Sequence, residues 1–261
     1  YRRCPSARGG SARPPAPVPG ATDPSPGTLA PARIIETDTL AGTDRIDEAL
    51  TETGWATWNA ANSMGMAQGL SVRGFVFSDQ NNTQLQASRV LINGHADIAW
   101  RFMRDPATLE SARLLGGTDA TLTGAGGPGG TLHMLTKSPS GQRNTQLTTR
   151  FASDGTRRLV TDAERALGPL QMRGVAALHS GQRGFDKLVD RHQAALLSTR
   201  LPYGNGGPVR HLQLDLEYHC NHQPYSFGIP YQAGRFWLDR NYVDTEHAHA
   251  DRRYTRQALY W

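Results

Sequence analysis

Histidine and cysteine side chains gather in the C-terminal third of the chain, where they could bind a metal ion. His219, Cys220 and His222 are nearly consecutive, and His247 and His249 follow further along the chain. Imidazole and thiolate groups are preferred ligands of Zn²⁺, but this segment matches none of the ligand spacings of structural zinc sites. In a β-strand, His219 and Cys220 would also point to opposite faces. We therefore predict no metal site, with a metal-touching loop as the alternative.

A glycine-rich segment, Gly124–Gly129, satisfies the G-x-G-x-x-G pattern of dinucleotide-binding proteins. That site requires a strand before the loop and a helix after it, so that the helix N-terminus meets the pyrophosphate. Here the residues after the loop, Thr131–Lys137, are rich in strand formers, and Pro128 removes one backbone amide. We interpret the segment as a tight turn. No Ser-His-Asp or Cys-His arrangement has a supporting motif, and we predict neither catalytic residues, nor a cofactor, nor enzyme activity.

The net charge of +5, from 28 basic and 23 acidic residues, raises the possibility of nucleic-acid binding. The arginines are scattered, however, and no stretch interleaves them with aromatic residues as a base-stacking surface would. We therefore predict no nucleic-acid partner and keep a soluble, basic, β-rich nucleic-acid-binding protein as a distant alternative. The two cysteines exclude a disulfide-built scaffold. No apolar run is long enough for a membrane-spanning helix.

Three segments follow one another along the chain. Residues 1–32 hold eight of the 16 prolines and should form a disordered linker without a signal peptide. Residues 33–140 mix patterns and predict a small α+β domain. Its expected strands are 33–37, 70–77, 89–92 and 131–137, with a helix over 43–50 and a short helix running into a strand over 106–115.

Residues 141–261 are predicted to be β-strand throughout. In His211–Cys220 apolar residues alternate strictly with polar ones, over the length of a tilted strand that crosses a bilayer. Weaker strands are expected at 146–152, 159–166, 171–181, 193–201 and 255–261. A soluble β-sandwich would show the same alternation. A loop of about 34 residues over 221–254 exceeds usual hairpin lengths and favours a membrane barrel.

Four ordered blocks within residues 70–140 resemble the plug domain of TonB-dependent outer-membrane receptors, particularly siderophore receptors. Leu70–Phe75 looks like the family's Ile-Arg-Gly-Phe signature, and Leu91–Gly94 sits where the family has a strand ending in Asp-Gly. Leu109–Gly124 follows the I-E-R-V-E-V-L-R-G-P-x-x-L-L-Y-G block without a gap. Residues 126–139 are similar to the A-P-G-G-T-I-N-L-V-T-K-R-P stretch.

The resemblance implies an α+β plug domain followed by antiparallel β-strands of an incomplete transmembrane β-barrel. It also implies TonB-dependent uptake of a ferric siderophore across the outer membrane of a Gram-negative bacterium. The implied partners are the ferric siderophore, TonB with ExbB and ExbD, and outer-membrane lipid. A closed barrel needs more strands than these, so we expect the chain to be a fragment of a receptor, with a degenerate, non-transporting fragment as the alternative. We find no convincing TonB box; Thr37–Leu40 is a faint candidate that is better interpreted as the first plug strand and its exit.

By the same resemblance, two upper loops of the plug, 78–84 and 95–101, would bind the siderophore. The candidate ligand-binding residues are Asp79, Gln80, His95, Asp97 and Trp100. The candidate plug-motif and barrel-contact residues are Arg73, Gly74, Glu110, Gly124, Gly130 and Lys137. Two departures from the family pattern concern plug docking. Gly116 stands where the family has a second arginine that pairs with acids of the barrel wall, and Arg113 stands where it has a glutamate.

Overall fold

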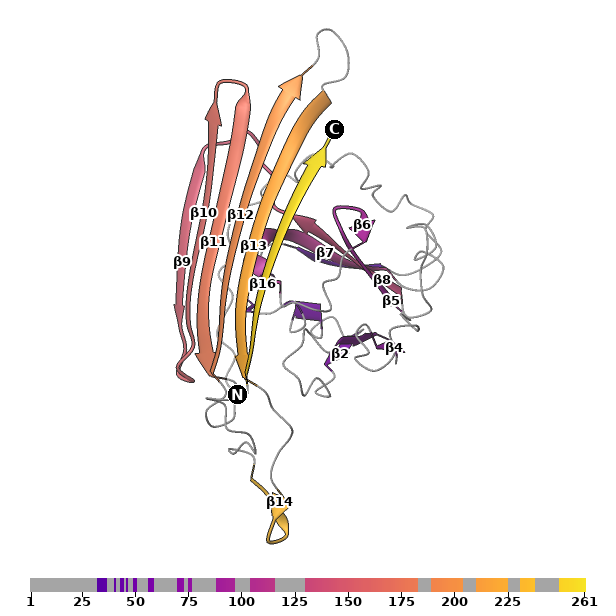
Figure 1. Ribbon diagram of the computed structural model, residues 1–261, viewed down its shortest axis with the longest axis vertical. Coiled ribbons are helices and arrows are strands. Elements are labelled where there is room, and N and C mark those ends of the chain that lie inside the picture. The colour runs from indigo at the N-terminus through magenta and orange to yellow at the C-terminus, as the bar shows by residue number, and fades with distance from the viewer. Residues whose placement is uncertain are drawn as a thin grey trace, which may run out of the picture.

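The computed structural model describes fifteen stretches of the chain. They are residues 32–36, 40, 43–44, 46, 49–50, 56–58, 70–72, 75–76, 88–96, 104–115, 130–182, 189–203, 210–224, 231–237 and 249–261. Within them the fold has two main parts, a mixed sheet that we call the plug and a tall antiparallel sheet that we call the wall (Figure 1). No helix in these stretches is both long and apolar enough to cross a membrane.

The plug is built on a five-stranded sheet in the order β1-β7-β8-β5-β6. Its strands are β1 (Ala32–Glu36), β5 (Ser88–Ile92), β6 (His95–Ala96), β7 (Leu109–Leu115) and β8 (Gly130–Thr136). Only β5 and β8 are parallel. A smaller sheet joins β2 (Ala56–Trp58), β3 (Leu70–Val72) and β4 (Phe75–Val76), and a 3-10 helix, η2 (Pro106–Thr108), leads into β7.

Apolar residues from the sheet and from the segment before it form the plug core. Ile46, Ala49 and Leu50, which lie within the helix predicted over 43–50, are buried there together with Leu40. The sheet contributes the remaining buried residues: Ile35, Val90, Ile92, Leu109, Ala112, Leu114, Leu132 and Met134. The plug therefore has a hydrophobic core of its own, which does not include residues of the wall.

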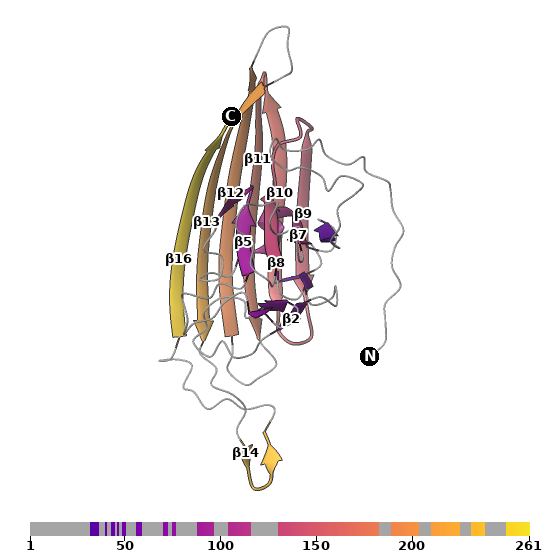
Figure 2. The same cartoon turned by 90° about the vertical axis from the view of Figure 1, so that its right-hand side faces the viewer.

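The wall consists of six strands in sequence order, each antiparallel to the next. They are β9 (Asn144–Phe151), β10 (Arg157–Leu167), β11 (Leu170–Gln182), β12 (Val189–Tyr203), β13 (Arg210–Pro224) and β16 (His249–Tyr260). Between the last two lies a small hairpin of β14 (Tyr231–Gln232) and β15 (Arg235–Phe236). The plug sheet lies against one face of this curved wall (Figure 2).

The two faces of the wall differ in chemistry because the side-chain period of a strand is two residues. The face toward the plug carries buried polar residues, with Gln213, Asp215, Glu217 and His219 alternating along β13. The opposite face carries large apolar side chains that remain exposed. They include Leu147, Phe151, Leu159, Leu178, Leu197, Leu201, Leu212, Leu214, Leu216, Tyr218 and Leu259. This is the reverse of a water-soluble sandwich, in which the apolar face would be covered.

The predicted strand ends and the long loop need correction. The strand predicted over 211–220 runs over 210–224, and the one predicted over 255–261 begins at His249. Asn221 and His222 pair in register with Arg252 and Asp251, so the ladder continues where the apolar alternation stops. The expected loop over 221–254 is therefore shorter, and it contains the β14–β15 hairpin.

The two neighbouring isoleucines of β1 allow a matched test of the plug core. Ile35 is 4% exposed whereas Ile34, on the other face, is 42% exposed. Ile35→Ala should lower the free energy of unfolding by about 2–5 kcal/mol because it leaves a cavity in the core. Ile34→Ala should cost close to 0.5 kcal/mol, as exposed substitutions usually do. Urea unfolding in detergent, followed by tryptophan fluorescence, measures both; equal losses would contradict the placement of β1.

Candidate functional site

The plug meets the wall through a short stretch, Arg104–Thr108, that we call the docking segment. Asp105 caps η2 with its side chain, because Oδ1 accepts a hydrogen bond of 2.8 Å from the backbone N–H of Ala107. Pro106 follows at the first helical position, which suits its fixed φ. The hydroxyl and the N–H of Thr108 both donate to the carbonyl of Asp105. This local hydrogen bonding holds the carboxylate in one orientation.

Asp105 forms a two-pronged ion pair with Arg158 of the wall strand β10. The two guanidinium nitrogens lie 2.6 and 3.0 Å from the two carboxylate oxygens. His192 of β12 adds a third contact, with its Nε2 2.8 Å from Oδ2 of Asp105. An ionised carboxylate only accepts hydrogen bonds, so this contact requires the proton of His192 to be on Nε2.

The pKa of Asp105 lies well below its usual range. Burial of the carboxyl acts in the opposite direction and would raise the pKa. It is outweighed by the hydrogen bond from His192 and by the charge of Arg158. The carboxylate is therefore ionised at all physiological pH values, and the docking contact is a full ion pair.

A second plug acid, Asp44, meets the same row of the wall. It forms ion pairs with Arg150 of β9 and with Arg158, whose Nε lies 3.5 Å from Oδ1 of Asp44. Arg150 and Arg158 face each other in the register of β9 and β10. Arg158 thus lies between two carboxylates that come from separate parts of the plug.

Ala107 occupies an apolar patch on the inner face of the wall. It is 4% exposed and packs among four wall residues, Val175, Ala177, Ala194 and Leu196. These lie on the adjacent strands β11 and β12. The docking segment therefore fits a small apolar patch with charged contacts on either side.

Arg104 provides the charged contact on the other side of the docking segment. Its guanidinium forms an ion pair with Glu217 of β13, whose side chain is fully buried. Glu217 also accepts hydrogen bonds from His219 at 2.8 Å and from Arg256 of β16 at 3.0 Å. Glu217 is therefore paired with two guanidiniums and one imidazole, and loss of the carboxylate would leave both guanidiniums without this partner.

The turn between β5 and β6 makes a third contact, at the far end of the wall. Asn93 adopts the left-handed conformation, with φ of 48°, and Gly94 follows with φ of 84°. The side-chain nitrogen of Asn93, Nδ2, donates to the hydroxyl of Tyr260 at 2.9 Å and to the carboxylate of Asp215 at 3.3 Å. The hydroxyl of Thr136 donates to the same carboxylate, with Oγ1 3.3 Å from Oδ2 of Asp215.

Two further clusters hold the end of the plug to the first wall strands. Lys137 lies 2.9 Å from Asp162 of β10, and Arg173 of β11 binds the same carboxylate. Arg173 also reaches the plug residue Glu110 at 3.2 Å. Next along the chain, Glu164 accepts hydrogen bonds from the backbone N–H groups of residues 140, 141 and 142, at 2.5, 2.7 and 3.2 Å.

The predicted site residues fall into two groups. Arg73, Gly74, Asp79, Gln80, Asp97, Trp100 and Gly124 lie outside the described residues. Four are described. Lys137 and Glu110 contact the wall, Gly130 begins β8 with φ of 107°, and His95 is exposed with its ring centroid 6.0 Å from that of Tyr260.

Of the two residues that depart from the family pattern, Gly116 and Arg113, the structure describes only the second. Gly116 lies outside the described residues. Arg113 pairs across the plug sheet with His133 of β8. Burial of His133, together with the charge of Arg113, lowers the pKa of that imidazole. Arg113 thus acts on a plug neighbour.

Sequence reasoning missed Asp105, Arg104 and Asp44. Asp105 carried a recognisable signal, since Asp followed by Pro is typical of a helix start, but nothing local indicated a partner on β10. The wall residues Arg158, Glu217 and Asp215 lie at inward positions of alternating strands. Their partners come from the plug, and the alternation within a single strand does not indicate which plug residues will contact it.

The sequence matches no protein-family model and no curated protein. Several solved structures share the fold. The ferric-catecholate import receptor Fiu of E. coli, in its closed form, aligns with a TM-score of 0.64 and 21% identity over 78% of this chain. The receptor FpvA of P. aeruginosa, bound to a pyoverdine and iron, aligns with a TM-score of 0.66 and 18% identity over 87% of this chain. The siderophore receptor PiuA of Acinetobacter baumannii gives 0.62 and 18% over 78%.

The chain spans less than a third of the length of these receptors, at 28%, 30% and 28%. At identities this low the similarity establishes the fold. The chain therefore has the fold of the plug and the first wall strands of outer-membrane siderophore receptors, as the sequence predicts.

The ion pair of the docking segment can be tested by substitution. Asp105→Asn should lower the free energy of unfolding by about 3–5 kcal/mol, because it leaves the buried Arg158 without its main partner. Asp154→Asn is the matched control. That carboxylate caps a hairpin turn and makes no contact with the plug among the described residues, so its loss should cost about 1 kcal/mol or less. Urea unfolding in detergent at pH 7 measures both.

The pH dependence of this difference provides the second readout. The pKa of Asp105 is lower in the folded state than in the unfolded state, where it is about 3.9. Its contribution is therefore fully present above about pH 5 and is lost as the pH falls toward the folded pKa. The gap between wild type and Asp105→Asn should narrow below about pH 4; a gap of constant size would contradict the ion pair.

Proposed function

We propose that this chain is the N-terminal part of a TonB-dependent receptor that takes up a ferric siderophore across the outer membrane of a Gram-negative bacterium. The proposed plug spans residues 33–140, and residues 141–261 are the opening strands of the barrel. The observation that carries the proposal is the docking of a separately cored plug onto the polar inner face of a wall whose outer face is apolar. A plug that gates a lumen requires this arrangement.

The outer face of the wall supports the membrane location. Its exposed leucines recur at every second position of β13, at Leu212, Leu214 and Leu216. Strands β10 to β13 and β16 have between 11 and 15 residues, which is enough for a tilted strand to cross the hydrocarbon core. In lipid these leucines would be solvated by acyl chains, and the antiparallel ladder would pair their backbone groups.

Release of the plug fits the chemistry of its contact with the wall. In the part of the chain that the structure describes, the docking contacts are largely charged or polar, and Ala107 is the plug residue that enters an apolar patch. Polar groups can exchange protein partners for water, so separation does not expose a large apolar surface. We propose that TonB, energised by ExbB and ExbD, pulls the plug away from these contacts after the siderophore binds.

The siderophore would bind at the upper loops of the plug, at Asp79, Gln80, His95, Asp97 and Trp100. Of these residues the structure describes His95, which is exposed and has its ring centroid 6.0 Å from that of Tyr260, near the C-terminal end of β16. The proposed plug-motif residues are Arg73, Gly74, Glu110, Gly124, Gly130 and Lys137. Of these, Lys137 and Glu110 are joined through Asp162 and Arg173.

Uptake of radioactive iron tests the proposed function. Cells that carry the full-length receptor and lack their other iron receptors should accumulate ⁵⁵Fe from a ferric catecholate or from a ferripyoverdine, and deletion of TonB should abolish this uptake. Binding to purified outer membranes should persist without TonB. Failure of both chelates to bind, with the receptor folded in the membrane, would contradict the proposal.

The loop assignment is tested in the same assay. Replacement of residues 95–101 by a Gly-Ser sequence of equal length should weaken chelate binding at least about tenfold, because the site loses most of its polar contacts. The matched control replaces the hairpin tip at residues 152–155, which is exposed on the wall. Unchanged affinity of the 95–101 variant would contradict the loop assignment but leave the receptor function standing.

A further inference from the structure

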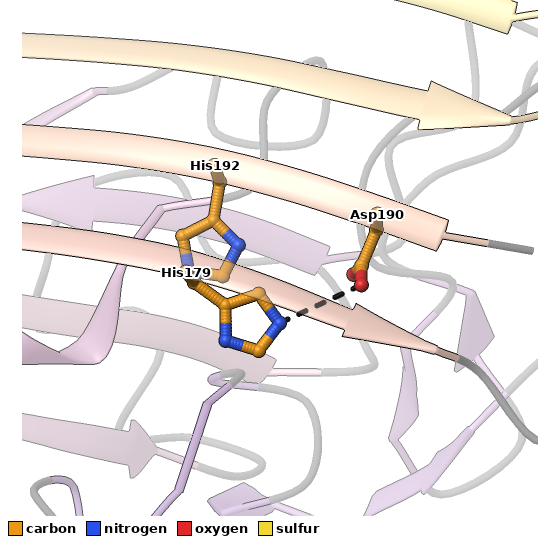
Figure 3. Close-up of side chains that lie close together, drawn as sticks. All are labelled: His179, Asp190 and His192. Atoms are coloured by element: carbon orange, nitrogen blue, oxygen red, sulfur yellow. Dashed lines mark ion pairs between the residues drawn. The ribbon is translucent and has the colours of Figure 1, made fainter. Parts of the chain in front are cut away.

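Two histidines and an aspartate converge on the inner face of the wall, beside the docking segment. His179 of β11 faces His192 of β12 across the ladder, and Asp190 is two residues before His192. All three residues are buried, with exposed fractions of 8%, 2% and 3%. The rings stack with centroids 4.2 Å apart, and Asp190 lies at their open edge (Figure 3).

The spacing of these side chains suits a metal ion. Nε2 of His179 lies 3.5 Å from the carboxylate of Asp190, and one ligand atom from each of the three residues lies within 4.8 Å of the others. Two atoms bound at 2.0–2.1 Å to a tetrahedral Zn²⁺ are about 3.4 Å apart. Small side-chain rotations would therefore bring all three atoms within bonding distance of one ion.

The hydrogen bonding of His192 directs a lone pair into this cluster. Nε2 lies 2.8 Å from the carboxylate of Asp105 and 3.3 Å from Nη1 of Arg158. When Nε2 donates its proton to the carboxylate, the lone pair lies on the other ring nitrogen, Nδ1. That Nδ1 is buried and has no hydrogen-bond partner among the described residues. A nitrogen lone pair that is buried and unsatisfied costs free energy, and coordination of a cation would recover it.

The carboxylate of Asp44 lies near Nδ1 of His179, as that of Asp105 lies near Nε2 of His192. Nδ1 of His179 lies 3.8 Å from Oδ1 of Asp44, and both atoms lack a hydrogen-bond partner among the described residues. Histidines that bind metals usually donate their other N–H to a carboxylate, which fixes the ring and makes it a better ligand. Asp105 and Asp44 occupy these positions behind the two rings.

Carboxylate groups near the rings also suit a cation. Three carboxylates, those of Asp44, Asp105 and Asp190, surround the cluster, whereas two guanidinium groups, those of Arg150 and Arg158, pair with them. Carboxylate oxygens are suitable ligands for a divalent ion, and that of Asp190 lies next to Nε2 of His179.

Gly181 leaves open space beside the proposed ligand atom. It sits opposite Asp190 in the ladder, and a Cβ at this position would lie 2.8 Å from Nε2 of His179. Any other residue would push the ring aside. On the same strand, a Cβ at Gly174 would meet nothing within 4 Å.

We propose that His179, Asp190 and His192 bind one divalent transition-metal ion of the Zn²⁺ class at the contact between plug and wall. Asp105 and Asp44 would orient the two imidazoles from the plug side. Since Asp105 also pairs with Arg158, the ion would stabilise the docked plug. The site does not depend on which chelate the receptor imports, nor on whether it imports one.

Zinc titration of the full-length protein, purified in detergent and stripped with a chelator, tests the site. Calorimetry with Zn²⁺ should give one tight equivalent, and Co²⁺ should give visible absorption bands of four-coordinate intensity. His192→Ala and Asp190→Asn should abolish that equivalent, and Asp105→Asn should weaken it about 10–100-fold. Elemental analysis after dialysis gives the stoichiometry independently of heat signals.

Gly181→Ala is the sharpest variant, because it retains every ligand and only displaces the His179 ring. It should lose the tight equivalent, whereas Gly174→Ala should retain it. Circular dichroism and heat-modifiable gel mobility check that both variants are folded. Zinc binding that is unchanged in His192→Ala and Gly181→Ala would overturn the proposal. So would a tight equivalent that is lost only in His222→Ala, which alters the half-exposed cluster with His249 and Asp251.

Discussion

Charge buried between the plug and the wall is the constraint on which this structure depends. Arg158, Glu217 and Asp215 are nearly inaccessible to water on the inner face of the wall, so each needs a partner of suitable charge or hydrogen-bonding capacity. Asp105, Arg104 and Asn93 of the plug supply those partners. These three polar contacts lie at different heights along the wall, and the ion pairs of Asp44, Lys137 and Glu110 with wall residues add to them.

The two faces of the wall explain how the same strands can carry charge and still suit a membrane. Alternation along β13 sends Asp215 and Glu217 inward and Leu214 and Leu216 outward. Among the described residues the core of the plug is separate from the wall, and the apolar cluster that joins them consists of Ala107 and its wall neighbours. Separation of the two parts would thus break ion pairs that water can replace, without dismantling either hydrophobic core.

The wall strands could be predicted from local alternation, whereas the choice of a plug with a barrel wall over a soluble sandwich depended on the resemblance of residues 70–140 to the plug family. Alternation marked the wall strands, and the motif around Leu109–Leu115 marked the plug strand that leads away from η2. The strand ends at Pro224 and His249 could not be predicted, since polar residues such as Asn221 continue the ladder without an apolar signal. The contacts of Arg104 and Asp105 could not be predicted either, because they join residues more than 50 positions apart in the chain. The histidine cluster could not be predicted because the register of β11 and β12, which no sequence signal specified, brings His179 opposite His192.

A double-mutant cycle on Arg104 and Glu217 tests the docking account most directly. The free energy of unfolding is measured for wild type, Arg104→Gln, Glu217→Gln and the double variant. Because the two charges are buried and in direct contact, the account predicts that the second substitution costs less once the first is present, with a coupling of about 1–3 kcal/mol. Additive costs would mean that these residues do not interact, and would contradict the docking of the plug through buried charge.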